Sequence, residues 1–98
     1  PIRSGHTLVI TKRQIDYIFD LEDNLLSGLM IFSKKVGTAI KKATYCQRVG
    51  VVVAGYEVPH THVHLIPTNS MSDFNFALSQ QADQGELAAM VTKIQEYL

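Results

Sequence analysis

Three histidines alternate with other residues in the stretch PHTHVHLIP, and this alternation limits the structures that the segment can adopt. Side chains of a β-strand point alternately to its two faces, so His60, His62 and His64 would share one face of a strand. In a helix, side chains two positions apart diverge, and a proline at each end of the stretch also disfavours a helix. The pattern therefore predicts a strand over residues 60–67 with a row of imidazoles on one face. The opposite face, which can pack on a helix, would consist of Thr61, Val63 and Leu65.

The rest of the sequence predicts two further strands and two helices. Strands are expected over residues 5–13 and 46–58, and the run VVVA in the second suggests burial on both faces. Helices are expected over residues 20–43 and 83–98, because apolar residues recur there at intervals of three and four. The apolar stripe of the long helix would contain Leu25, Leu29, Phe32, Val36 and Ile40. That of the second helix would contain Leu87, Met90, Val91, Ile94 and Leu98.

Composition narrows the classes of function. The chain has 98 residues, of which 46% are hydrophobic, so we expect a single domain over residues 1–98. Nine basic residues balance nine acidic ones, whereas a protein that binds a nucleic-acid polymer usually carries a basic excess. No apolar run is long enough for a membrane span. A single cysteine, Cys46, excludes an internal disulfide framework and favours a reducing, cytoplasmic setting.

A row of imidazoles is compatible with more than one chemistry. It could be the polar face of a half-buried strand, without further function. It could bind zinc or copper, for which imidazole is a common ligand, although only Glu57 among acidic residues lies beside the row. It could also act on phosphorus, because a neutral imidazole with a pKa of about 6.5 is nucleophilic at pH 7. Neighbouring imidazoles would then orient the nucleophile and donate to phosphoryl oxygens.

The stretch HTHVHLI resembles the signature of the histidine-triad (HIT) superfamily, His-x-His-x-His followed by apolar residues. The stretches GHTLVITKRQID and AGYEVPHTHVHLIP extend the resemblance over most of residues 1–67. The resemblance implies an α+β fold, an antiparallel sheet with a long helix packed on it and a C-terminal helix. The full family domain has about five strands, and fewer are expected here. It also implies a two-fold homodimer, with the helix at 22–42 and the strand at 48–55 as candidate interface elements.

The resemblance further implies an enzyme. Family members cleave at the α-phosphorus of purine nucleotide derivatives, such as phosphoramidates and dinucleoside polyphosphates, through a nucleotidyl-histidine intermediate. His62 matches the nucleophile, His64 the histidine that contacts phosphoryl oxygens, and His60 the one that supports the central ring. This chemistry requires no cofactor and no metal. The expected substrate-binding residues are His6, Tyr56 and Glu57.

Three positions depart from the family pattern. Val49 stands where the family has an amide, Tyr56 where it has a glutamine, and Glu57 where it has Ser or Thr. An ionised carboxylate at Glu57 would repel a phosphate. These departures keep open the alternative of a non-catalytic, nucleotide-binding homodimeric scaffold, and a metal-binding histidine strand remains a further alternative.

The start of the chain carries one more expectation. Pro1 resembles the proline of the turn that follows the family's ribose-binding acid. We therefore expect the domain to be incomplete at its N-terminus, with an acidic residue shortly before Pro1 in the native chain.

Overall fold

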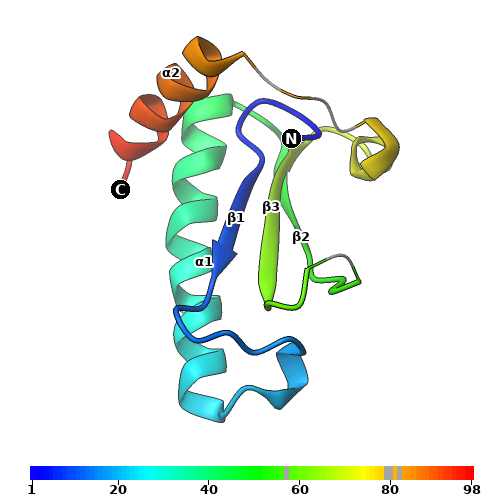
Figure 1. The fold of residues 1–98 in the computed structure, drawn as a ribbon. Helices are drawn as coiled ribbons and strands as arrows, with labels where there is room; N and C mark the ends of the chain where they lie inside the picture. The colour runs from blue at the N-terminus through cyan, green and yellow to red at the C-terminus, as the bar shows by residue number, and fades with distance from the viewer. Residues whose placement is uncertain (57, 79–80, 82) are drawn as a thin grey trace.

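A three-stranded antiparallel sheet packs against one long helix in the computed structural model, which describes residues 1–56, 58–78, 81 and 83–98 (Figure 1). The strands are β1 (Thr7–Ile10), β2 (Arg48–Val52) and β3 (His62–Thr68), in the order β1-β3-β2. The central strand of this sheet is therefore the one that carries His62 and His64. The expected α+β fold, with a long helix and a C-terminal helix, is confirmed.

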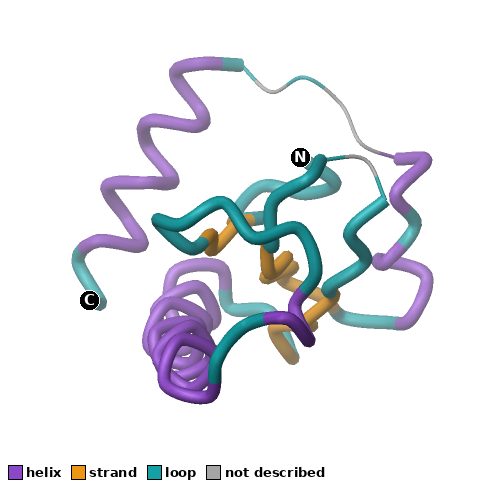
Figure 2. Tube along the Cα trace, turned by 60° about the horizontal axis from the view of Figure 1, so that its bottom comes forward, coloured by secondary structure: helices purple, strands orange, loops and turns teal. Residues whose placement is uncertain are grey.

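The long helix α1 (Asp23–Thr44) covers one face of the sheet, as the nearly end-on view of this helix in Figure 2 shows. Asp23 in its first turn and two lysines in its last turn complement the helix dipole. The helix ends at Tyr45, which adopts the left-handed conformation. The C-terminal helix α2 (Gln84–Gln95) packs against α1. None of the helices in the described residues is long and apolar enough to cross a membrane.

The described residues also form three short 3-10 helices. The helix η1 (Ile18–Asp20) lies in the connection between β1 and α1. The helices η2 (Met71–Phe74) and η3 (Phe76–Leu78) follow β3. The sequence predicted no helix or strand between residues 67 and 83, and the segment after β3 becomes important at the functional site.

The two faces of β3 have the different roles that its sequence predicts. Thr61, Val63 and Leu65 are buried, and the two apolar residues belong to the core under α1. The register pairs His64 with Leu8 and His62 with Ile10, so that these side chains share the face that lies away from α1. Burial of the apolar face therefore fixes the side on which the imidazoles emerge.

Two predicted details are wrong, one in the central strand and one in the apolar stripe of the long helix. The central strand begins at His62 instead of at residue 60, so His60 lies just before it. Phe32 was expected in the core but is 52% exposed, and Ser33 is buried in its place. The Ser33 hydroxyl donates to the carbonyl of Leu29 at 2.8 Å, which satisfies the buried hydroxyl within the helix.

The expectation that the second strand is buried on both faces is also wrong. β2 ends at Val52, and Val51 is 52% exposed because β2 lies at the edge of the described sheet. In α2, Ile94 is buried and Met90 packs against the core, whereas the other three residues of the expected stripe are more than a third exposed. α2 therefore contacts the rest of the molecule through a narrower face than predicted.

The segment after β3 folds back over the sheet. A Cβ atom at Gly50 would overlap the ring of Phe74, so the ring lies directly on the backbone of β2. Gly50 pairs in register with Ile66, which is fully buried although it lies on the same face as the histidines. The far end of the histidine face is therefore covered.

Candidate functional site

Three imidazoles, those of His6, His62 and His64, gather at the middle of the sheet face that lies away from α1. The ring centroids of His62 and His64 are 4.8 Å apart, and the rings are inclined at 71°. His6, which precedes β1, lies with its ring centroid 5.1 Å from that of His64. The structure thus brings together two of the triad histidines and the earlier histidine that the resemblance singled out.

His62 is oriented by the backbone just before it. Its Nδ1 lies 2.7 Å from the carbonyl oxygen of His60. A carbonyl oxygen can only accept, so Nδ1 carries the proton and donates. In the neutral ring, Nε2 then bears a lone pair and no proton. This is the protonation pattern that a nucleophilic imidazole requires.

His64 is held from its other side by His6. The distance between His6 Nε2 and His64 Nδ1 is 2.9 Å. The pKa of His6 is lowered from 6.5 to about 4, chiefly because burial disfavours its charged form and secondly because of the nearby His64. His6 is therefore neutral at pH 7 and acts as a hydrogen-bonding partner of His64.

His60 has a structural contact at the end of β1. Its Nε2 donates to the backbone carbonyl of Thr11 at 2.6 Å. The neighbouring Thr61 donates through its hydroxyl to the carbonyl of Ile15 at 2.6 Å and is buried. These bonds tie the start of β3 to the chain that leaves β1, and His60 supports His62 through its backbone carbonyl.

An aromatic side chain that sequence reasoning missed completes the group. Phe76, from η3, meets His64 edge to face with centroids 5.0 Å apart and an interplanar angle of 88°. It also meets His6 at 6.4 Å and 84°. Such edge-to-face packing restricts the orientation of the imidazoles. No spacing in the sequence indicates this contact, because it depends on the path of the chain after β3.

Tyr56, another predicted binding residue, is not brought to the imidazoles. Tyr56 is 96% exposed, on the turn that follows β2 and includes Gly55 at a positive φ of 83°. The side chain of Val49 packs against the core on the α1 side, so it does not face a phosphate beside His62. Glu57 lies outside the described residues. Among the described residues, no group of three or more His, Cys, Asp or Glu is placed to hold a metal ion.

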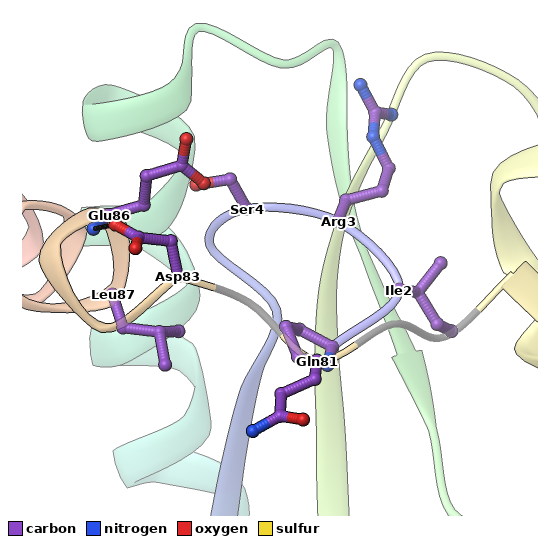
Figure 3. A pocket seen from close by; sticks show the side chains of 8 residues that line it. Ile2, Arg3, Ser4, Gln81, Asp83, Glu86 and Leu87 are labelled. Atoms are coloured by element: carbon purple, nitrogen blue, oxygen red, sulfur yellow. Dashed lines mark hydrogen bonds between the residues drawn. The ribbon is translucent and has the colours of Figure 1, made fainter.

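A separate hollow of about 260 Å³ lies between the segment before β1 and the first turn of α2 (Figure 3). Asp83 and Glu86 line one side, and the Arg3 side chain extends away from them. Arg3 instead pairs with Asp73 at 2.7 Å. None of the four histidines lines this hollow, so it is distinct from the imidazole group.

Comparison with known sequences identifies a family. The HIT domain family matches residues 1–71 of the chain. The chain is 34% identical over 98 aligned residues to the asymmetrical bis(5'-nucleosyl)-tetraphosphatase of Schizosaccharomyces pombe. This alignment covers 92% of the chain and 54% of that protein. It is 38% identical over 69 residues to the adenosine 5'-monophosphoramidase of Saccharomyces cerevisiae, covering 68% of the chain and 43% of that protein. The chain therefore spans about half the length of these curated relatives.

Solved structures share the fold. A hypothetical histidine triad nucleotide-binding protein from Sulfolobus tokodaii superposes with a TM-score of 0.86 at 25% identity, covering 99% of this chain and 71% of that one. A Hit-like protein from Bartonella henselae, crystallised with an unknown ligand, gives a TM-score of 0.85 at 25% identity, covering 100% and 74%. The arrangement of sheet, long helix and C-terminal helix is thus shared along the whole described chain.

Proposed function

Because the chain belongs to the HIT domain family, we propose that it is a nucleotide hydrolase or transferase that acts at the α-phosphorus of a purine nucleotide derivative. One observation carries this proposal: the hydrogen bond of 2.7 Å from His62 Nδ1 to the carbonyl oxygen of His60. It leaves Nε2 of the neutral ring as a lone-pair nucleophile.

The reaction would proceed in two displacements. His62 Nε2 attacks the α-phosphorus, a nitrogen–phosphorus bond forms, and the bond from phosphorus to the leaving nitrogen or oxygen breaks. Water then attacks the same phosphorus and breaks the nitrogen–phosphorus bond, which returns the imidazole and releases the nucleoside monophosphate. His64 donates to a phosphoryl oxygen, and His60 and His6 keep the two rings in place.

The surface beside the imidazoles and the relatives support the substrate class that we propose. Leu8 and Ile10 are 53% and 57% exposed and lie opposite His64 and His62 in the sheet register. An apolar surface next to a phosphate-reactive row suits a nucleoside that covers it. The two curated relatives are named for a tetraphosphatase and a phosphoramidase, so we propose nucleoside phosphoramidates and dinucleoside polyphosphates as substrates.

A non-catalytic nucleotide-binding scaffold is the second candidate. It is favoured by the positions of Val49, which faces α1, and Tyr56, which is exposed. These are two of the three positions where the family pattern has a polar residue near the phosphate, and neither lies on the imidazoles here. The nucleophile is present in both candidates, so turnover distinguishes them.

We also propose that two copies of the chain associate through α1 and β2. A groove of about 360 Å³ lies between them. Edge strands with exposed apolar side chains such as Val51 are natural sites for pairing with a second copy. The groove is lined by Met30, Ser33, Lys34, Gly37, Thr38, Lys41, Val49, Val51 and Leu65.

We also propose that the protein is located in the cytoplasm. The sequence has a single cysteine, Cys46, which is buried and free, and a lone free cysteine suits a reducing compartment.

The test compares the native protein with His62→Ala. Wild-type protein should release AMP from adenosine 5'-phosphoramidate or from a diadenosine polyphosphate. His62→Ala should lower kcat by about 10⁴-fold or more, because it removes the nucleophile and not merely an orienting group. Calorimetric binding of AMP should persist in this variant, and circular dichroism should show an unchanged fold. Turnover that survives in His62→Ala would overturn the mechanism, and nucleotide binding by an inactive wild type would favour the scaffold.

A further inference from the structure

The segment before β1 folds back and directs a backbone N–H at an imidazole of the site. The amide of Ile2 donates to His6 Nδ1 at 3.1 Å. The turn is closed by the amide of His6, which donates to the carbonyl of Arg3 at 3.0 Å. Gly5 adopts a φ of +94°, and a Cβ atom there would lie 2.9 Å from Thr44 Cγ2, so this turn requires glycine.

The same turn is fixed to the sheet by a side chain. Nη1 of Arg3 donates to the carbonyl of Pro67 at 3.2 Å and to Asp73 Oδ2 at 2.7 Å. The Ile2 amide is thus held in place by bonds to β3 and to the segment that follows it. Its contact with His6 is part of a built turn.

This contact determines where the proton of His6 lies. A neutral imidazole has one N–H donor and one acceptor nitrogen. Because Nδ1 accepts from Ile2, the proton is on Nε2. Nε2 lies 2.9 Å from His64 Nδ1, so His6 donates and His64 Nδ1 accepts. The opposite tautomer of His6 would set its Nδ1–H against the N–H of Ile2.

We propose that the Ile2 amide is a positioning group: it fixes the tautomer of His6, and His6 in turn keeps the proton of His64 on Nε2. The purpose of this arrangement rests on the proposed function. An Nε2–H group lets His64 donate to a phosphoryl oxygen without having to be cationic. Two backbone groups therefore give adjacent rings opposite tautomers. The His60 carbonyl gives His62 a bare Nε2, and the Ile2 amide, acting through His6, gives His64 a protonated Nε2.

Nitrogen-15 NMR of the full-length protein tests the assignment directly, without substrate. Long-range proton–nitrogen correlations at pH 7 distinguish Nδ1–H from Nε2–H rings. The expected spectrum shows Nε2–H for His6 and His64 and Nδ1–H for His62. A proton on Nδ1 of His6 or of His64 would overturn the inference while leaving hydrolysis by His62 possible. These tautomers in a protein without turnover would support the inference and contradict the proposed function.

Variants test whether Ile2 is the cause. Ile2→Pro removes the N–H, and Ile2→Val keeps it. Ile2→Pro should give mixed tautomers at His64 and lower kcat by about tenfold, whereas Ile2→Val should match wild type. The side-chain amide of His6→Gln donates without help from Ile2, so Ile2→Pro should have no further effect on kcat in that background. Equal losses in both backgrounds would contradict the proposal.

A second pair of variants covers the case in which Ile2→Pro fails to fold. His6→Gln should retain the Nε2–H signature of His64, and His6→Leu, which cannot donate, should lose it. Retention of the signature in His6→Leu would show that His64 needs no donor from this side and would overturn the proposal.

Discussion

Nε2 of His6 and Nδ1 of His64 lie 2.9 Å apart although the two residues are separated by 58 positions in the chain. The contact joins the start of β1 to the middle of β3 across the strand pair. The pKa of His6 therefore depends on how the segment before β1 packs against β3. The first prediction follows from that dependence.

Acid should destabilise the protein through His6. Its pKa in the folded state is about 4, against 6.5 for an ordinary histidine, so the unfolded chain binds the proton more readily. The free energy of unfolding should therefore fall as the pH drops from about 6.5 towards 4, and this contribution is fully present above pH 6.5. Urea unfolding at steps between pH 7 and pH 4 measures the slope in wild type and in His6→Phe. The variant should show a shallower decrease, and equal slopes would mean that His6 titrates normally.

Two glycine-to-alanine substitutions should have opposite effects. Gly50→Ala places a Cβ where the Phe74 ring lies, and the displaced ring should cost about 1–3 kcal/mol of the free energy of unfolding. Gly28→Ala in α1 meets nothing within 4 Å and should stabilise by up to about 1 kcal/mol through helix propensity. Thermal unfolding of both variants gives the comparison. In a Phe74→Ala background the cost of Gly50→Ala should largely disappear, and an undiminished cost there would show that strain in β2 itself is responsible.

Asp73 should stabilise the segment after β3 in a pH-dependent way. Its pKa is held below the ordinary value of 3.8, first by the backbone N–H of Asn69 and also by Ser70 and Arg3. A lowered carboxyl pKa contributes stability above pH 3.8, and this contribution is lost as the pH falls through the folded-state value. Asp73→Asn should therefore lower the Tm at pH 6 but differ little from wild type once the carboxyl is protonated. Asp16→Asn, on the exposed connection between β1 and η1, serves as the charge-matched control, and a similar loss in that variant would argue against a local role.

A charge in the groove between α1 and β2 should break the proposed dimer. Val51→Asp puts a carboxylate among the apolar side chains that would be buried between two copies. Sedimentation equilibrium should give a dimer for wild type and a monomer for this variant. Val58→Asp, at another exposed apolar position that does not line the groove, should leave the dimer intact. A dimer that survives Val51→Asp would place the interface elsewhere.

Local periodicity explains which parts of the structure were predictable. The long helix was expected over residues 20–43 and is found at Asp23–Thr44, and the faces of β3 followed from alternation alone. Phe32 was misplaced because spacing of three and four allows either 32 or 33 in the stripe. Hydrophobicity favours phenylalanine, whereas the hydroxyl of Ser33 is satisfied by its own helix and tolerates burial.

The candidate site was predictable only where its chemistry lies on one strand. His62 and His64 are two positions apart on β3, so the alternation of side chains along a strand predicts that they share one face. The contacts of Ile2 and Phe76 depend on a glycine turn and on the path of η3, which no local pattern encodes. His6 was singled out only by the family resemblance, because sequence spacing does not indicate contacts between distant segments.

The two faces of β3 are subject to different evolutionary constraints. Odd-numbered residues from Thr61 to Leu65 are buried and hold the strand in the core, while His62 and His64 on the other face carry the proposed chemistry. A substitution at His62 or His64 can change the proposed chemistry with little effect on folding, whereas one at Val63 or Leu65 can weaken folding with the chemistry unaltered. Substitutions on the histidine face can therefore change which substrate a protein of this kind accepts, while the buried face preserves its thermodynamic stability.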